Sequence, residues 1–377
     1  MGPLFFIIMM LDIDAGLSKC KLGSFADDTK VWYLIKSLYD QAQLQQELNT
    51  LYKWSDDNNF DFNEKKFEHL SYGRSDLETS YHTPNANPIK KNDPVRDLGV
   101  HFSPTGTFSE HIKIIVAEAK KISGYILRTF RTRERGPMLT LLKSLVVSKL
   151  EYACVLWSPT DKRSIRILEN VQRRFTSKIG GFYTDEEGNG RLKCQKDYWE
   201  RLKDLKIYSL QRRRERYMIL YLYKVIIGLC PNPGFERILF NDRTGFKVES
   251  KRAKTAAAWV QKLRNSSFFS QGPTIFNMLP IDLRNFSIPE HPSKTDVDKY
   301  KEKLDKYLRN IPDQPDIPNA KNMRAAETNS LVHQIHYWTQ PSQSSQTSQP
   351  FQPSNSATTT NDSSCNTSHR NNQSSLN

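Results

Sequence analysis

The chain has 377 residues and a formal net charge of +14, from 55 lysines and arginines against 41 acidic residues. The whole excess lies between residues 111 and 230, where 26 basic residues stand against 12 acidic ones. A basic block in an otherwise neutral chain points to a polyanionic partner, most simply nucleic acid, although an acidic substrate or an anionic membrane surface would also suit it. The five cysteines form no close pair, which argues against a zinc site or a disulfide framework and favours an intracellular protein.

The first 110 residues mix short apolar runs, one helical pattern and many turn residues, which is typical of an α+β fold. The apolar run at 4–11 is too short to span a bilayer and has no basic residue before it, so we expect a buried strand or helix and not a signal. The pattern at 21–34 predicts a β-hairpin with Asp27 and Asp28 at its tip. An amphipathic helix is predicted over 40–54.

A further short strand is predicted around 97–102, before the basic block begins. Within the block, apolar stripes at helical spacing predict four helices, over 108–130, from Pro137 onward, over 160–179 with Thr160 or Asp161 as its cap, and over 199–227. The third helix carries basic residues mainly away from its apolar stripe: Arg163, Arg166, Arg173, Arg174 and Lys178. The fourth carries a run of arginines that includes Arg212 and Arg213.

The C-terminal part differs in composition. Residues 231–313 contain Gly, Pro and short apolar pieces and are predicted to form a helical extension. From Trp338 onward 29 of 40 residues are Ser, Thr, Gln or Asn, which bury too little apolar surface to order themselves. We therefore predict four segments, 1–110, 111–230, 231–313 and a disordered tail over 314–377.

Two adjacent carboxylates at a hairpin tip suit a divalent cation, because Mg²⁺ prefers hard oxygen ligands. In polymerases, carboxylates hold two ions that activate the primer hydroxyl and stabilise the leaving pyrophosphate. The alternative is a solvated turn, since Asp is a common turn residue.

Residues 25–28, Phe-Ala-Asp-Asp, resemble motif C of the reverse transcriptases of non-LTR retrotransposons, in the jockey-like and chicken-repeat-like groups. Residues 2–6 are similar to the end of motif B, and 62–66 to motif D, with Phe67 in place of the usual Cys. Residues 97–100 are similar to motif E. Further similarities follow in the family's order at Tyr152, Trp157, 168–173, 210–213, 223–224, 267–269, 277–280 and 304–308.

The resemblance covers about residues 2–313 and implies part of a right-hand polymerase palm at 1–110, followed by an all-α thumb at 111–230 that holds the primer–template duplex. It implies Mg²⁺ as the cofactor, with Asp27 as the main metal ligand and Asp28 as its neighbour. Lys66 would donate a proton to the leaving group, although a solvent-facing Lys65–Lys66 pair is the simpler interpretation. The implied partners are an RNA template, a DNA primer and deoxynucleoside triphosphates, without a membrane, and the implied location is the nucleus.

The family's motif A, which carries the third catalytic aspartate, lies upstream of motif B, and this chain begins inside motif B. We therefore expect an incomplete metal site and no polymerase activity without partners in trans. Two alternatives stay open, a nucleic-acid-binding module without chemistry and a non-functional transposon relic with uncovered apolar surface. The basic residues at 163–178 would contact phosphates or form an ordinary solvated face. Those at 212–216 would contact phosphates or pair with nearby acids such as Asp204 and Glu215.

Overall fold

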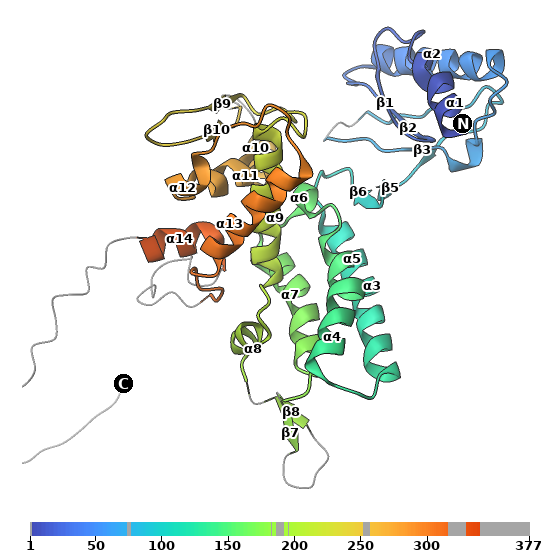
Figure 1. Cartoon of the computed structure of the whole chain (residues 1–377). Coiled ribbons are helices and arrows are strands. Elements are labelled where there is room, and N and C mark those ends of the chain that lie inside the picture. Colours follow the sequence, from blue (N-terminus) through green and yellow to red (C-terminus); the bar gives the residue numbers. More distant parts are fainter. Residues whose placement is uncertain are drawn as a thin grey trace, which may run out of the picture. The chain divides into compact units, whose positions relative to one another are not determined.

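The computed structural model describes residues 2–73, 77–181, 183–185, 192–194, 196–251, 257–315 and 329–339. The described chain is mixed α and β and mostly helical, and each of its sheets has two strands (Figure 1). The predicted mixture of α and β elements is therefore confirmed at this level.

The N-terminal region contains the predicted hairpin and the predicted helix. Its first elements are α1 (Gly2–Met9), η1 (Met10–Asp12), β1 (Lys21–Phe25), β2 (Asp28–Trp32) and α2 (Leu38–Asp57). The turn between β1 and β2 has two residues, of which Ala26 lies in the left-handed region with φ 53°. Ser37 begins α2, because its hydroxyl accepts a hydrogen bond from the backbone N–H of Asp40 at 3.3 Å.

The apolar run near the N-terminus is helical, but its side chains are not buried. Leu4, Phe5, Ile7 and Ile8 are 53–63% exposed. The expectation of a buried element is therefore wrong for these side chains, although Phe6 does contact the ring of Phe60. The helix has eight residues, and within the described ranges no helix combines the length and apolarity needed to cross a membrane.

The rest of this region consists of short elements. They are η2 (Glu64–Lys66), β3 (Glu68–His69), β4 (Lys90–Lys91), β5 (Val95–Asp97) and β6 (Val100–Phe102). The sequence predicts one strand at 97–102, and the structure instead has the antiparallel hairpin β5–β6. Leu98 and Gly99 both have positive φ, 44° and 82°, as the central residues of a type I′ hairpin turn require.

The first helical group confirms the helices predicted over 108–130, after Pro137 and over 160–179. It contains α3 (Ser109–Thr129), α4 (Arg135–Leu141), the π-helical η3 (Leu142–Val147), α5 (Ser148–Glu151), α6 (Cys154–Trp157) and α7 (Lys162–Thr176). Its core includes Ile126, Met138, Leu150, Leu168 and Phe175, none more than 1% exposed. Asp161, and not Thr160, caps α7, because its carboxylate accepts from the backbone N–H of Ser164 at 2.8 Å.

The prediction of one long helix over 199–227 is wrong, because the structure has α8 (Tyr198–Leu205) and α9 (Leu210–Ile226). Lys206 ends α8 with φ 52°, and the Ser209 hydroxyl begins α9 by accepting from the N–H of Arg212 at 3.1 Å. The Asp313 carboxylate accepts from both the backbone N–H and the hydroxyl of Ser209, at 2.6 and 2.8 Å. The break is thus stabilised by a residue far along the chain.

A second core forms around the C-terminal half of α9. The remaining elements are β7 (Tyr183–Asp185), β8 (Leu192–Cys194), β9 (Arg237–Leu239), β10 (Lys247–Glu249), α10 (Ala258–Ser266), α11 (Phe268–Asn277), α12 (Ile281–Arg284), α13 (Lys294–Leu308) and α14 (Leu331–Thr339). Leu210 belongs to the first core, whereas the residues from Met218 onward belong to the second. The division between the two cores therefore lies within α9.

Residues 329–339 correct the prediction of a disordered tail over 314–377. Leu331 and Ile335 of α14 are 0% and 2% exposed and belong to the second core. The backbone N–H of Leu331 donates to Glu215 Oε2 at 2.9 Å, and Asn329 Nδ2 donates to Ser209 Oγ at 3.1 Å. Residues 316–328 and 340–377 lie outside the described ranges.

Candidate nucleic-acid interface

The exposed face of α7 is made of cations. The predicted basic residues of this segment are all exposed: Arg163, Arg166, Arg173, Arg174 and Lys178. Leu168, Val171 and Phe175 are buried on the opposite side. At about 100° per residue, the four arginines lie within roughly 100° of the helix circumference, and Arg163 and Arg174 are about 16 Å apart along the axis. Lys178 follows just after the end of α7 at Thr176.

The stability of the helix does not explain this arrangement. Arg173 and Arg174 lie in the last turn of α7, where a cation interacts favourably with the helix dipole. Arg163 lies in the first turn, where the same dipole is unfavourable for a positive charge. Glu169, the one acidic residue of α7, is 5% exposed and faces the core. The exposed face is therefore positive along its whole length.

A buried tyrosine of α8 lies beneath Arg173. The Arg173 guanidinium carbon is 4.7 Å from the ring centroid of Tyr198, which is 1% exposed. The Tyr198 hydroxyl donates to Glu169 Oε2 at 2.6 Å and accepts from Gln172 Nε2 at 3.1 Å. Sequence analysis did not select Tyr198, because only the packing of α8 against α7 places its ring at this position.

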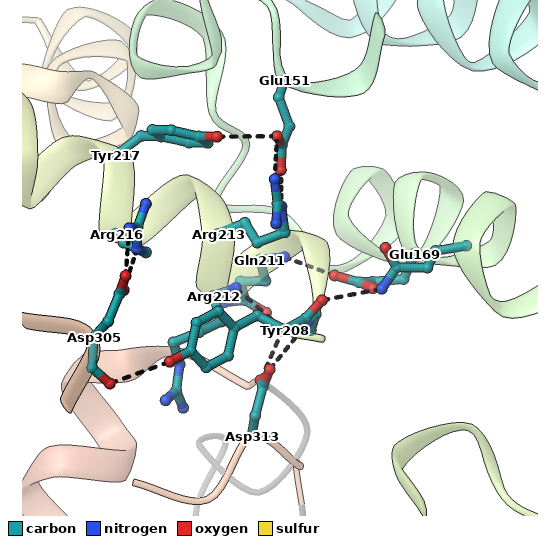
Figure 2. A network of polar contacts seen from close by, with 12 residues as sticks. Glu151, Glu169, Tyr208, Gln211, Arg212, Arg213, Arg216, Tyr217, Asp305 and Asp313 are labelled. Atoms are coloured by element: carbon teal, nitrogen blue, oxygen red, sulfur yellow. Dashed lines mark hydrogen bonds and ion pairs between the residues drawn. The ribbon is translucent and has the colours of Figure 1, made fainter. Parts of the chain in front are cut away.

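Three arginines of α9 lie among residues of neighbouring segments, and Figure 2 shows two of them paired with acidic residues. Arg212 is 0% exposed, and its Nη1 and Nη2 donate to the carbonyl oxygens of Ile311 and Pro312 at 3.3 and 2.9 Å. Its assignment to a nucleic-acid surface is therefore corrected, because a buried guanidinium bonded to carbonyls cannot reach a phosphate. Arg213 forms a bidentate ion pair with Glu151, with Nη2 at 2.7 Å from Oε2.

Arg216 is also paired, with Asp305 of α13, at 2.8 Å between Nη2 and Oδ2. Arg213 and Arg216 therefore pair with acidic residues, as the alternative interpretation expects. Their partners are Glu151 and Asp305, however, and not Asp204 or Glu215. Figure 2 shows both pairs, which join α9 to Glu151 of α5 and to Asp305 of α13. The arginine run therefore joins neighbouring helices instead of forming a surface for nucleic acid.

Buried charges continue this network toward α7. Glu169 Oε1 accepts from the backbone N–H of Gln211 at 2.7 Å (Figure 2). Since Oε2 accepts from Tyr198, the two oxygens bridge α8 and α9. Burial raises the pKa of Glu169, and the positive charge of Arg214 opposes that shift. Arg214 is 1% exposed, and its three guanidinium nitrogens have no hydrogen-bond partner among the described residues. Burial also raises the pKa of Glu215, to about 7.

Asp27 and Asp28 lie at the exposed tip of the β1–β2 hairpin. Their carboxylates are the ligand type that Mg²⁺ prefers. In the described ranges, however, no group of three or more ligand-type side chains gathers at this tip or elsewhere. Two carboxylates fall short of the set that a pair of ions needs. Lys66 is exposed on η2, and no hydrogen bond or ion pair joins it to either aspartate.

Glu47 of α2 anchors the segment that leads into this hairpin. Its carboxylate accepts from the N–H and the hydroxyl of Ser18 at 2.9 and 2.8 Å, and from the N–H of Lys19 at 3.2 Å. Cys20 Sγ lies 3.5 Å from the same carboxylate. Although burial opposes it, the hydrogen bonds from Ser18 hold the pKa of Glu47 below its usual value.

Glu47→Ala is expected to lower the free energy of unfolding by about 2 to 3 kcal/mol, because it leaves several donors of residues 18–20 without their charged acceptor. Glu47→Gln keeps one acceptor oxygen and should lose less. Gln46→Ala, on the exposed side of the same helix, is the matched control and should change stability by less than about 0.5 kcal/mol. Urea denaturation measures all three variants, and equal losses for Glu47→Ala and Gln46→Ala would refute the anchoring role.

Two histidines that look isolated in the sequence meet where β6 is followed by α3. His101 Nδ1 and His111 Nδ1 are 3.4 Å apart, and His111 Nδ1 accepts from the backbone N–H of His101 at 3.3 Å. His111 is 1% exposed and contacts the ring of Trp157. Two histidines alone are too few ligands for a metal site. Burial, together with this contact, instead lowers the pKa of His111, which makes the stability of the protein depend on pH.

Comparison with protein-family models, with curated proteins and with solved structures finds no match. The cationic face of α7 is the part of the predicted site that the structure assembles.

Proposed function

We propose that this chain binds nucleic-acid duplexes through the cationic face of α7, as the primer–template-binding thumb of a non-LTR retrotransposon reverse transcriptase. One observation carries the proposal, namely that four exposed arginines share one face of α7, with the exposed Lys178 just after it, while the one acidic residue of α7 is buried. An ordinary solvated helix face usually mixes both signs of charge. The similarity of 168–173 to the family's thumb supports the same role.

The dimensions of the face suit a phosphate backbone. Phosphates of one strand follow one another every 3.4 Å or so along the duplex axis, so the roughly 16 Å from Arg163 to Arg174 is long enough to contact more than one of them. Cations that neutralise phosphates release condensed counterions, which makes the affinity fall as salt rises. Such contacts fix the position of a duplex without reading its sequence.

The double variant Arg173→Ala/Arg174→Ala is expected to weaken binding to an RNA–DNA hybrid duplex about tenfold or more. The slope of log affinity against log salt should fall by roughly two, because each lost phosphate contact removes about one unit. Fluorescence anisotropy with a labelled hybrid across a salt series measures both quantities.

The control is Lys299→Ala/Lys301→Ala, which removes the same charge from exposed positions of α13. It should leave the salt slope near that of the unchanged protein. If the two double variants lose the same affinity and slope, then only net charge matters and a specific role for α7 is excluded.

The same proposal assigns Asp27 and Asp28 to a magnesium site that further carboxylates would complete, with deoxynucleoside triphosphates as substrates and the nucleus as the location. Mg²⁺ would supply charge neutralisation for nucleotidyl transfer when bound. Two aspartates alone do not supply the ligands for two ions, so the binding experiment addresses the role of α7 and not the magnesium site.

A further inference from the structure

The first turn of α8 holds one aromatic ring, that of Tyr198, under Arg173 of α7. Asp197 and Glu200 form a capping box, in which Asp197 Oδ2 accepts from the N–H of Trp199 at 3.1 Å and Glu200 Oε2 accepts from the N–H of Asp197 at 3.1 Å. The box places Tyr198 in the first turn of α8. Its hydroxyl is held on the buried side by Glu169 and Gln172.

Arg173 has an aromatic ring beneath its side chain. Its guanidinium lies over the Tyr198 ring at 4.7 Å. Its backbone carbonyl accepts from Arg201 Nη2 at 3.2 Å, and Arg201 is itself 4% exposed. Arg174 is equally exposed, but within the described ranges no aromatic ring lies beneath its guanidinium. Two neighbouring arginines of one cationic face thus differ in how firmly they are held.

This difference has a consequence for phosphate binding. The N–H donors of a guanidinium lie in its plane. Stacking on a ring covers one face of the group but leaves this edge free to make paired hydrogen bonds with phosphate oxygens. Stacking also removes rotamer freedom before binding, so less is lost when a phosphate is bound. Lysine has the same charge but no planar group to stack, and therefore does not replace arginine at such a position.

We infer that Tyr198 is a positioning residue for nucleic-acid binding, which holds the Arg173 guanidinium so that its N–H edge faces a backbone phosphate. The inference rests on the proposed function of α7 and adds a specific requirement to it. Arg173 has to be an arginine over an aromatic ring, whereas Arg174 has to be only a cation.

The test compares two charge-conserving variants of the full chain, with the RNA–DNA hybrid duplex as the probe. Arg173→Lys is expected to weaken binding about two- to fivefold, because an unstacked side chain has to be ordered when the phosphate binds, whereas Arg174→Lys should change it by less than about 1.5-fold. Both positions are exposed, so folding is preserved. Equal effects of the two lysine variants would overturn the inference.

Tyr198 variants provide the second arm. Tyr198→Phe keeps the ring and should keep the affinity, even though the lost hydroxyl lowers the melting temperature. Tyr198→Leu should weaken binding as Arg173→Lys does, and combining the two should add nothing further. An additive double variant would overturn the inference. If Tyr198→Leu does not fold, the lysine pair and Tyr198→Phe decide.

The failure of this inference is distinguishable from the failure of the proposed function. If Arg173→Ala/Arg174→Ala leaves the salt slope unchanged, the duplex is not bound at this face, and both fail together. If that double variant lowers the salt slope but Arg173→Lys and Arg174→Lys change the affinity equally, then α7 binds the duplex and only the role of Tyr198 is excluded.

Discussion

Glu169→Ala is expected to lower the free energy of unfolding by about 3 to 5 kcal/mol, the cost of removing one partner from a buried charged network. The carboxylate accepts from the Gln211 backbone N–H and the Tyr198 hydroxyl, and both donors would lose their acceptor. Arg214, whose buried guanidinium has no hydrogen-bond partner among the described residues, would also lose a nearby negative charge. Alanine therefore removes two hydrogen bonds and the counter-charge of Arg214 together.

Two further variants separate these effects. Glu169→Gln keeps an acceptor oxygen but removes the charge. It should therefore lower the free energy of unfolding measurably, but by less than Glu169→Ala does. Glu118→Ala removes an exposed glutamate from α3 and should change stability by less than about 0.5 kcal/mol. Urea denaturation followed by circular dichroism measures all three. A loss below about 1 kcal/mol for Glu169→Ala would show that the network is not what joins α7, α8 and α9.

Local patterns predicted the elements whose signals lie within a few residues. The apolar stripe of α3 and the Asp161 cap of α7 are local features, and both are in the structure. The break between α8 and α9 was not predicted, because residues 198–226 keep a helical pattern. What ends the helix there includes the Asp313 carboxylate, which bonds Ser209 from about a hundred residues away.

The same limit applies to the candidate site. The charge of the segment 111–230 was counted as available to a partner, but Arg213 and Arg216 are neutralised by Glu151 and Asp305. Asp305 lies outside the segment, so the local count could not include it. The charge excess is therefore weaker evidence for nucleic-acid binding than it looks in the sequence. This correction does not affect the face of α7, because its four arginines and the following Lys178 are exposed and its one acidic residue is buried.

Because His111 is buried, we expect the stability of the protein to fall in acid. Burial, with the neighbouring His101, lowers the pKa of His111 to about 4 from an ordinary value of 6.5. Its Nδ1 accepts a hydrogen bond from the His101 N–H, and protonation would remove that lone pair. Because the unfolded chain then binds a proton more readily than the folded one, stability is full above about pH 6.5 and is lost toward pH 4, by roughly 3 kcal/mol.

A pH titration of the unchanged protein alone would hide this loss. The pKa of Glu215 is raised to about 7 from 4.5, so its contribution has the opposite sign and rises as the pH falls through the same range. The measurement must therefore be a difference between variants. His111→Asn offers Oδ1 as an acceptor in place of Nδ1 but does not titrate, and it leaves Glu215 unchanged.

We expect the unchanged protein to be more stable than His111→Asn at pH 7.5, because the ring packs against Trp157. That advantage should shrink by roughly 3 kcal/mol by pH 4, as the variant has no histidine to protonate at this position. A difference between the unchanged protein and His111→Asn that stays constant with pH would mean that His111 titrates normally in the folded state, and that the contact between His101 and His111 opens in solution.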